Sequence, residues 1–133
     1  MRALLAGSSM GILLWAAAAA PAAIAAEPRV RGPAAVTPGR IVAFHADGFR
    51  PGNLVNVVLF PAAKPSCCAA RIASSYLVAR NGGAALSFRM PRYYLRCPEG
   101  RKCTKIRWRM HERVVVTVFG YLQQASTTTS VEP

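Results

Sequence analysis

Four cysteines, Cys67, Cys68, Cys97 and Cys103, carry the most versatile chemistry in this 133-residue chain. Their sulfurs could form two disulfides, act as a redox pair, or bind zinc together with the downstream His111. Zinc knuckles and redox-active cysteine pairs both usually have two cysteines separated by two residues, C-x-x-C, and the sequence contains no such pair. We therefore expect all four cysteines in disulfides and no bound metal.

The first 26 residues are typical of a secretory signal peptide. Arg2 supplies a positive charge, residues 3–26 carry no charge, and residues 23–25 match the A-x-A pattern of a cleavage site. We expect cleavage near Ala26 and a single domain over residues 27–133, secreted or held in the cell envelope, where thiols become oxidised. An uncleaved N-terminal anchor is the alternative, because the uncharged run is long enough to span a bilayer.

A strongly basic segment, residues 89–113, holds nine of the 17 Lys and Arg of a chain with net charge +12. Such a charge attracts polyanions, and an anionic envelope polymer or a membrane surface is a more plausible partner for an exported protein than nucleic acid. The candidate polyanion-binding residues are Arg92, Arg96, Arg101, Lys102, Lys105, Arg107 and Arg109.

The same segment has a simpler interpretation. In residues 105–111, cationic residues and His111 alternate with Ile106, Trp108 and Met110. A half-buried edge strand shows this pattern too, with its apolar residues inside and its charges in water. Alternatively, Trp108, with Tyr93 and Tyr94, could contact a membrane interface.

Residues suited to catalysis are scarce. Asp47 is the one aspartate, in a turn where its side chain is expected to bond to the backbone, and His45 is expected to be packed or bonded to the turn. Glu99 and Glu112 lie among arginines, and no serine lies in a G-x-S-x-G motif. We therefore expect a protein that is not an enzyme and needs no cofactor.

The elements that position these residues are β-strands. Apolar and polar residues alternate with a period of two in several runs rich in Val, Ile, Thr and aromatic residues, and no run has a helical period. Turn residues separate the runs, as in "HADGFRPGN". There, Gly48 is expected to end a strand with a positive φ, Pro51-Gly52 to form a type II turn, and Phe49 to point into the core.

The segments "VTPGRIVAFHADGFRPGNLVNVVLF", "ARNGGAALSFRMP" and "RVVVTVFGYLQQASTTTSV" resemble immunoglobulin-like β-sandwich modules of secreted bacterial proteins. They are also similar, more distantly, to neocarzinostatin-type apoproteins. The resemblance implies an all-β, immunoglobulin-like Greek-key sandwich of about seven strands, with the basic segment as a long insert between the fifth and the sixth. The strands are expected at 34–37, 40–46, 54–60, 71–79, 84–90, 113–119 and 125–131.

In that fold, Cys67 and Cys68 share a loop at the same end of the sandwich as Cys97 and Cys103. A disulfide between adjacent cysteines is rare, which favours crossed bridges from each member of the pair to the basic segment. The neocarzinostatin resemblance implies the competing arrangement, in which Cys97 pairs with Cys103 and leaves Cys67 and Cys68 as a vicinal pair or as two thiols. These pairings stay open at the level of the sequence.

We therefore expect a secreted or envelope-associated module that binds rather than catalyses, with its basic segment on an anionic surface. A small-molecule carrier of the neocarzinostatin type and a purely structural domain are the alternatives. A carrier requires a concave apolar pocket, whereas a polyanion binder requires cations gathered on one exposed face.

Overall fold

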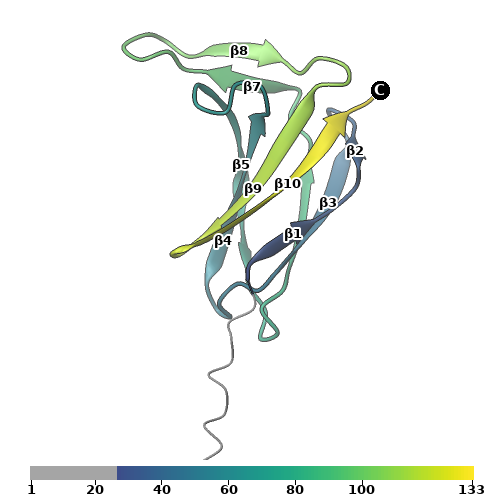
Figure 1. Ribbon diagram of the computed structural model, residues 1–133, viewed down its shortest axis with the longest axis vertical. Helices are drawn as coiled ribbons and strands as arrows, with labels where there is room; N and C mark the ends of the chain where they lie inside the picture. The colour runs from purple at the N-terminus through teal and green to yellow at the C-terminus, as the bar shows by residue number, and fades with distance from the viewer. Residues whose placement is uncertain (1–26) are drawn as a thin grey trace, which may run out of the picture.

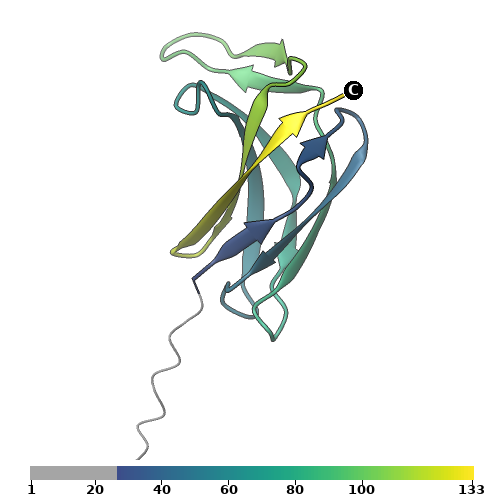
Figure 2. The same ribbon diagram turned by 45° about the vertical axis from the view of Figure 1, so that its right-hand side comes forward.

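The computed structural model describes residues 27–133, and the predicted signal peptide at residues 1–26 lies outside the described residues. The described chain is all β, and Figures 1 and 2 show its strands in two facing layers. The strands are β1 (Arg29–Arg31), β2 (Ala35–Val36), β3 (Ile41–Asp47), β4 (Leu54–Pro61), β5 (Cys68–Leu77), β6 (Ala84–Arg89), β7 (Tyr93–Arg96), β8 (Thr104–Arg107), β9 (Arg113–Gly120) and β10 (Gln123–Val131). Within residues 27–133, no helix has the length and apolar character needed to cross a membrane.

The two layers are sheets of unequal size. The smaller has the strand order β1-β3-β6, and the larger has the order β2-β10-β9-β4-β5-β7-β8. Neighbouring strands are antiparallel, except that β2 runs parallel to β10. The arrangement is a β-sandwich whose larger sheet extends beyond the smaller one through β7 and β8.

The core lies between the sheets and follows the period of two in the sequence. Alternate residues of β4 and β9, such as Val57, Leu59 and Val116, are fully buried against the smaller sheet. From that sheet, Phe44 and Phe88 stack with their ring centroids 5.9 Å apart. Alternation in the sequence therefore marks the inward face of each central strand.

Each of the seven expected strands has a counterpart in the structure within a few residues. The largest shift is in β5, which begins at Cys68 rather than near residue 71. Cys68 is therefore a strand residue, 3% exposed, and not a loop residue as expected. The short strands β1, β7 and β8 were not among the seven.

The corner at residues 47–53 has the expected geometry. Gly48 and Gly52 have φ values of 78° and 83°, and Phe49 is buried with 3% of its surface exposed. The corner is tied to the neighbouring loop, because the Phe49 amide donates to the Gly82 carbonyl at 3.2 Å and the Gly52 amide to Val78 at 2.9 Å. Turn chemistry alone therefore predicted how this end of the sandwich closes.

Candidate ligand-binding cleft

The β7–β8 hairpin extends the larger sheet across one end of the sandwich (Figure 1). Its inward face carries Tyr94 and Trp108, which are 6% and 5% exposed and pack with ring centroids 4.6 Å apart. Ile106 is half-buried on the same face, whereas Met110 is 52% exposed. The predicted membrane contact by Trp108 is therefore wrong, because the core already covers the indole; the half-buried edge strand describes Ile106 and Trp108 correctly.

Two disulfides lie at this end, Cys67–Cys68 and Cys97–Cys103. The favoured crossed bridges are therefore wrong, and the pairing of Cys97 with Cys103 follows the neocarzinostatin resemblance. The expected proximity is nevertheless confirmed, because the Cys97 amide donates to the Cys67 carbonyl at 3.1 Å. With all four sulfurs in disulfides, none is free to bind zinc as a thiolate.

A cleft of about 520 Å³ opens beside the hairpin, on the outward face of the larger sheet. Its floor and walls come from three strands and from the loops that flank them. The lining includes Phe60, Ala69, Arg71, Tyr93 and Leu95 together with Pro65, Pro91 and the Cys67–Cys68 disulfide. Its size falls within the range of small-molecule sites, and its lining is mainly apolar, as such sites usually are.

Strand register explains why these residues meet. Leu59 pairs with Ala70 on the inward face, which turns Phe60 and Ala69 outward. Ala69 then pairs with Leu95, and Leu95 with Lys105, so one apolar row crosses β4, β5 and β7 and ends in a cation on β8. The outward face of this sheet therefore has an apolar surface that the smaller sheet does not cover.

The cationic groups around the cleft follow from the same register. Arg71 lines the cleft, and Arg107 pairs with Tyr93 and places its guanidinium carbon 6.0 Å from the centroid of that ring. Lys105 lies on the same face. The side chains that line the cleft include no carboxylate. The site is therefore apolar with a positive edge.

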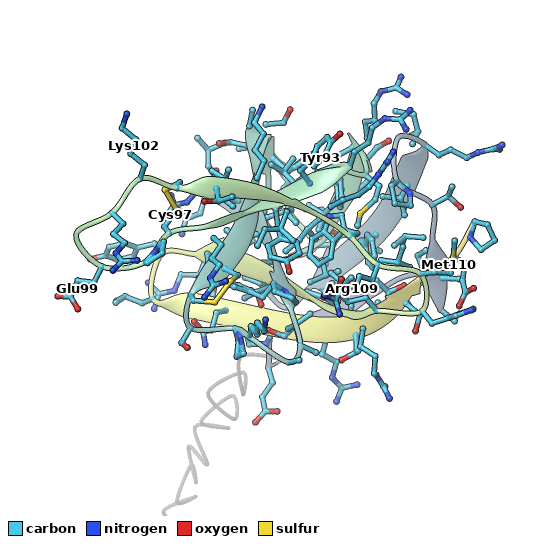
Figure 3. All side chains as sticks on the ribbon, turned by 90° about the horizontal axis from the view of Figure 1, so that it is seen from above. Tyr93, Cys97, Glu99, Lys102, Arg109 and Met110 are labelled. Carbon is cyan, nitrogen blue, oxygen red and sulfur yellow. A yellow bond between two sulfur atoms is a disulfide. The ribbon has the colours of Figure 1, made fainter. Side chains whose placement is uncertain are left out.

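The structure distributes the seven predicted polyanion-binding residues over several places. Lys105 and Arg107 flank the cleft, while the Arg92 guanidinium lies against Gly39, where a Cβ would come within 2.6 Å of Nη2. Arg109 lies in the turn after β8, where its amide donates to the Glu112 carboxylate at 2.9 Å. Figure 3 shows Lys102 and Arg109 at opposite ends of the hairpin.

The remaining three cations, Arg96, Arg101 and Lys102, gather around a second hollow of about 290 Å³ with Thr104 and Ile106. This hollow belongs to the face of the hairpin opposite Tyr93 and Leu95, since Arg96 pairs with Thr104 and Tyr94 with Ile106. The basic segment therefore presents cations on two faces rather than on one.

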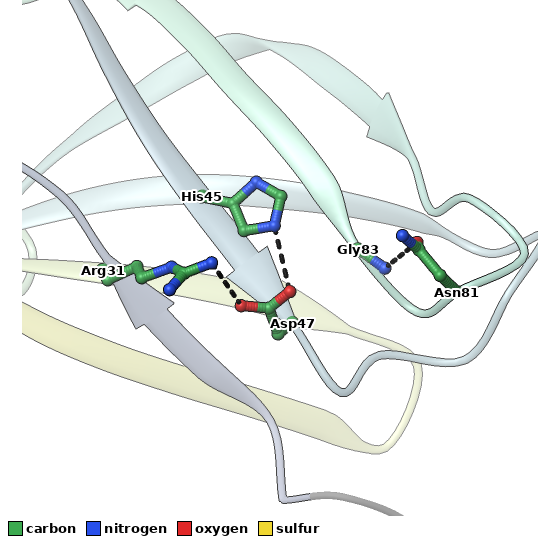
Figure 4. A network of polar contacts seen from close by, with 5 residues as sticks. All are labelled: Arg31, His45, Asp47, Asn81 and Gly83. Carbon is green, nitrogen blue, oxygen red and sulfur yellow. Dashed lines mark hydrogen bonds and ion pairs between the residues drawn. The ribbon is translucent and has the colours of Figure 1, made fainter.

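His45 and Asp47 form a polar network away from the cleft (Figure 4). His45 Nε2 lies 2.9 Å from Asp47 Oδ1, and Arg31 Nη2 lies 3.6 Å from Oδ2. Among residues 27–133, no hydroxyl or thiol hydrogen-bonds to His45, so this pair lacks the nucleophile of a catalytic triad. The network connects β1 to β3. The expectation that the Asp47 side chain bonds to the turn backbone is not met, because its carboxylate contacts the side chains of Arg31 and His45 instead.

No protein-family model matches the chain, and no curated protein matches its sequence. Among solved structures, macromomycin superimposes with a TM-score of 0.60 at 14% identity, covering 78% of this chain and 98% of macromomycin. The chain shares the fold of macromomycin. That likeness supports the distant similarity inferred from the sequence, and it concerns the fold alone.

Two further structures overlap more weakly. Superoxide reductase (neelaredoxin) from Ignicoccus hospitalis has a TM-score of 0.43 at 8% identity, covering 80% of each chain. The sulfur carrier protein SoxY from Chlorobium limicola f thiosulfatophilum has a TM-score of 0.37 at 15% identity, covering 81% of this chain and 76% of SoxY. Overlaps this weak carry no argument about this protein.

The cleft residues Phe60, Arg71 and Leu95 were not identified from the sequence. A signal was nevertheless present in the central strands. "VVLF" at residues 57–60 and "VVV" at residues 114–116 are apolar at consecutive positions, although strands of an antiparallel sheet with one solvated face should alternate apolar with polar residues. Apolar residues on the outward face of such strands indicate a surface that contacts a ligand or another molecule.

Proposed function

We propose that the protein binds and carries a small amphipathic molecule, an apolar ring system with one anionic group, in the cleft beside the β7–β8 hairpin. The observation that carries this proposal is the lining itself. Phe60, Tyr93 and Leu95 offer an apolar surface for a ring, and Arg71 offers a guanidinium for an anion. The macromomycin-like fold supports a binding module but does not identify a ligand.

The probe for this site is 1-anilinonaphthalene-8-sulfonate, which joins a fused ring to a sulfonate. N-phenyl-1-naphthylamine has the same rings without the charge. We expect Arg71→Gln to lower the affinity for the sulfonate probe about tenfold, as loss of a charge-assisted hydrogen bond does, and to leave the affinity for the neutral probe unchanged. Leu95→Ser should lower the affinity for both probes. Arg29 is an exposed arginine on β1, and Arg29→Gln should change neither affinity.

Fluorescence titration measures the affinities, and circular dichroism confirms that each variant is folded, because disordered chains also bind these dyes. Equal affinity of Arg71→Gln and Arg29→Gln for the sulfonate probe would remove Arg71 from the site. Unchanged binding of both probes by Leu95→Ser would refute the cleft as the binding site.

A second candidate function is adhesion of the basic hairpin to an anionic envelope polymer. The observation that favours it is the gathering of Arg96, Arg101 and Lys102 around one hollow. Binding to isolated envelopes should weaken steeply between low and physiological salt. Replacing these three residues by serine should abolish it, whereas an equal number of replacements at Arg29, Arg31 and Arg40 should not.

We also infer an immunoglobulin-like strand order and a site of action outside the cytoplasm. The pairing of β9 with both β4 and β10, and of β3 with β6, supports the strand order. The two disulfides are consistent with an oxidising compartment. Recovery of the mature domain from the exported fraction of its host, beginning near residue 27, tests the localisation.

A further inference from the structure

The end of the larger sheet opposite the hairpin exposes four large apolar side chains. Leu54 and Leu77 form a cross-strand pair and are 58% and 65% exposed. Tyr121 and Leu122 form the β9–β10 turn beside them and are 68% and 80% exposed. The pairing of Asn56 with Phe119 places Leu54 next to this turn, so the four residues form one surface, here called the apolar tip.

Leu122 has a φ of +58°, in the left-handed region that favours glycine. A side chain there strains the backbone, and the exposed leucine gains no packing in return. A glycine would satisfy the turn better and would also remove an apolar group from water. Neither turn geometry nor the core therefore explains a leucine at this position, whereas contact with an apolar partner does.

Cations flank the apolar tip. The Arg50 amide donates to the Gln123 side chain at 2.8 Å, and Gln123 Nε2 donates to the Gly48 carbonyl at 3.1 Å, which fixes the residue 48–52 loop beside the turn. Exposed Arg50 and Arg80 line one hollow of about 330 Å³ with Gln123. The carboxylates near this end are Asp47, which is paired with Arg31 and His45, and Glu27, where the described chain begins.

We propose that this end of the sandwich docks on an anionic lipid surface. Leu122 and Tyr121 enter the region between the headgroups, with Leu54 and Leu77 behind them, while Arg50 and Arg80 contact lipid phosphates. Apolar and aromatic side chains next to arginines are the usual composition of surfaces that lie at a membrane interface.

Two features favour lipid over a protein partner. The tip is a protruding hairpin turn rather than a groove, so it can enter a bilayer without a complementary pocket. Moreover, the exposed Arg50 and Arg80 lie beside the turn, where they can contact lipid phosphates while the apolar side chains enter the bilayer.

Co-sedimentation with phosphatidylcholine vesicles, with and without phosphatidylglycerol, tests the proposal. The exported, oxidised protein should bind the anionic vesicles. Leu122→Gly should weaken that binding about tenfold, since a buried leucine contributes that much or more. The same change should raise the melting temperature because glycine relieves the strained φ, so a loss of binding could not result from misfolding. Ile41→Ser is the matched control, because Ile41 is 61% exposed at the opposite end of the sandwich.

Arg50→Gln with Arg80→Gln should remove the preference for anionic vesicles while leaving the fold intact. A double change of Lys105→Gln and Arg107→Gln, on the hairpin, should leave vesicle binding unchanged. Equal binding by Leu122→Gly and the wild type, an equal loss in Ile41→Ser, or no binding of the wild type to either vesicle would overturn the proposal. Loss of vesicle binding only in the hairpin variant would also overturn it and would assign the lipid contact to the basic segment.

Discussion

Trp108 is the residue that packs the β7–β8 hairpin against the core. Its indole is buried against Tyr94, yet its Nε1–H has no hydrogen-bond partner among the described residues 27–133. A buried donor without a partner costs free energy, so the ring must contribute through its apolar area and its stacking. The residue that the sequence offered as a surface contact is thus the anchor of the hairpin.

This assignment predicts the effect of two substitutions. Trp108→Phe keeps an aromatic ring against Tyr94 and removes the unpaired N–H, so the free energy of unfolding should change by less than about 1 kcal/mol. Trp108→Ala should lower it by about 3–5 kcal/mol. Urea denaturation followed by circular dichroism distinguishes the two. If the phenylalanine variant lost as much as the alanine variant, the N–H would have a partner in solution.

At the scale of the elements, the two disulfides close loops of different length. Cys97–Cys103 closes a loop of a few residues between β7 and β8, whereas Cys67 and Cys68 are adjacent. In the chain-entropy model, stabilisation grows with the length of the closed loop. Changing Cys97 and Cys103 together to Ala should therefore lower the free energy of unfolding by about 2 kcal/mol.

The matched double variant at Cys67 and Cys68 should lose about 1 kcal/mol or less, because that bridge closes almost no loop. Thermal unfolding of the two variants under identical conditions provides the comparison. A larger loss from the adjacent pair would show that its bridge supports the cleft wall rather than merely joining neighbours.

Tyr76 connects the two sheets, since its hydroxyl donates to the Ser87 carbonyl at 2.8 Å from β5 to β6. Desolvation by burial raises the pKa of this phenol, and a hydrogen bond with the Ser74 side chain lowers it in part. The folded state therefore favours the neutral phenol. Its stabilising contribution should be complete below the ordinary pKa of 10.0 and decrease as the pH rises through the raised pKa.

The corresponding variant is Tyr76→Phe. Near pH 7 it should be less stable than the wild type by about 1 kcal/mol, the usual contribution of one hydrogen bond. That difference should shrink above pH 10.0, where the phenol begins to ionise in the unfolded chain, and should be lost as the pH rises through the raised pKa of the folded state. Denaturant titrations at several pH values measure it. A difference that stays constant across this range would mean that the phenol does not lose its bond on ionisation.

At the scale of the whole molecule, the larger sheet carries two surfaces at opposite ends. The cleft lies near Phe60, at the end of β4, and the apolar tip near Leu54, at its beginning. Mutations at separated sites with no shared partners usually have additive effects. Leu122→Gly should therefore leave the affinity of the cleft for the sulfonate probe unchanged, and Arg71→Gln should leave vesicle binding unchanged. Separate titrations of the two variants test this, and any cross-effect would indicate that the sheet couples its ends.

Local patterns in the sequence determined the seven main strands and the corner at residues 47–53. Both depend on short-range physics: side chains alternate along a strand, and Gly48 and Gly52 accept a positive φ. The same patterns left β8 as one of two interpretations of the alternating residues 105–111, and they did not predict β1 and β7, in which only three and four residues pair with a neighbouring strand.

Only the tertiary structure decided the disulfide pairing, the burial of Trp108, the division of the basic residues between two faces, and the cleft. Each depends on which strands become neighbours and in which register, and a change of one residue in register exchanges the two faces of a strand. Composition established that the chain is basic and that its cysteines could be bridged. The pairing of β5 with β7 then decided that Leu95 joins Phe60 at a cleft while Arg96 faces away from it.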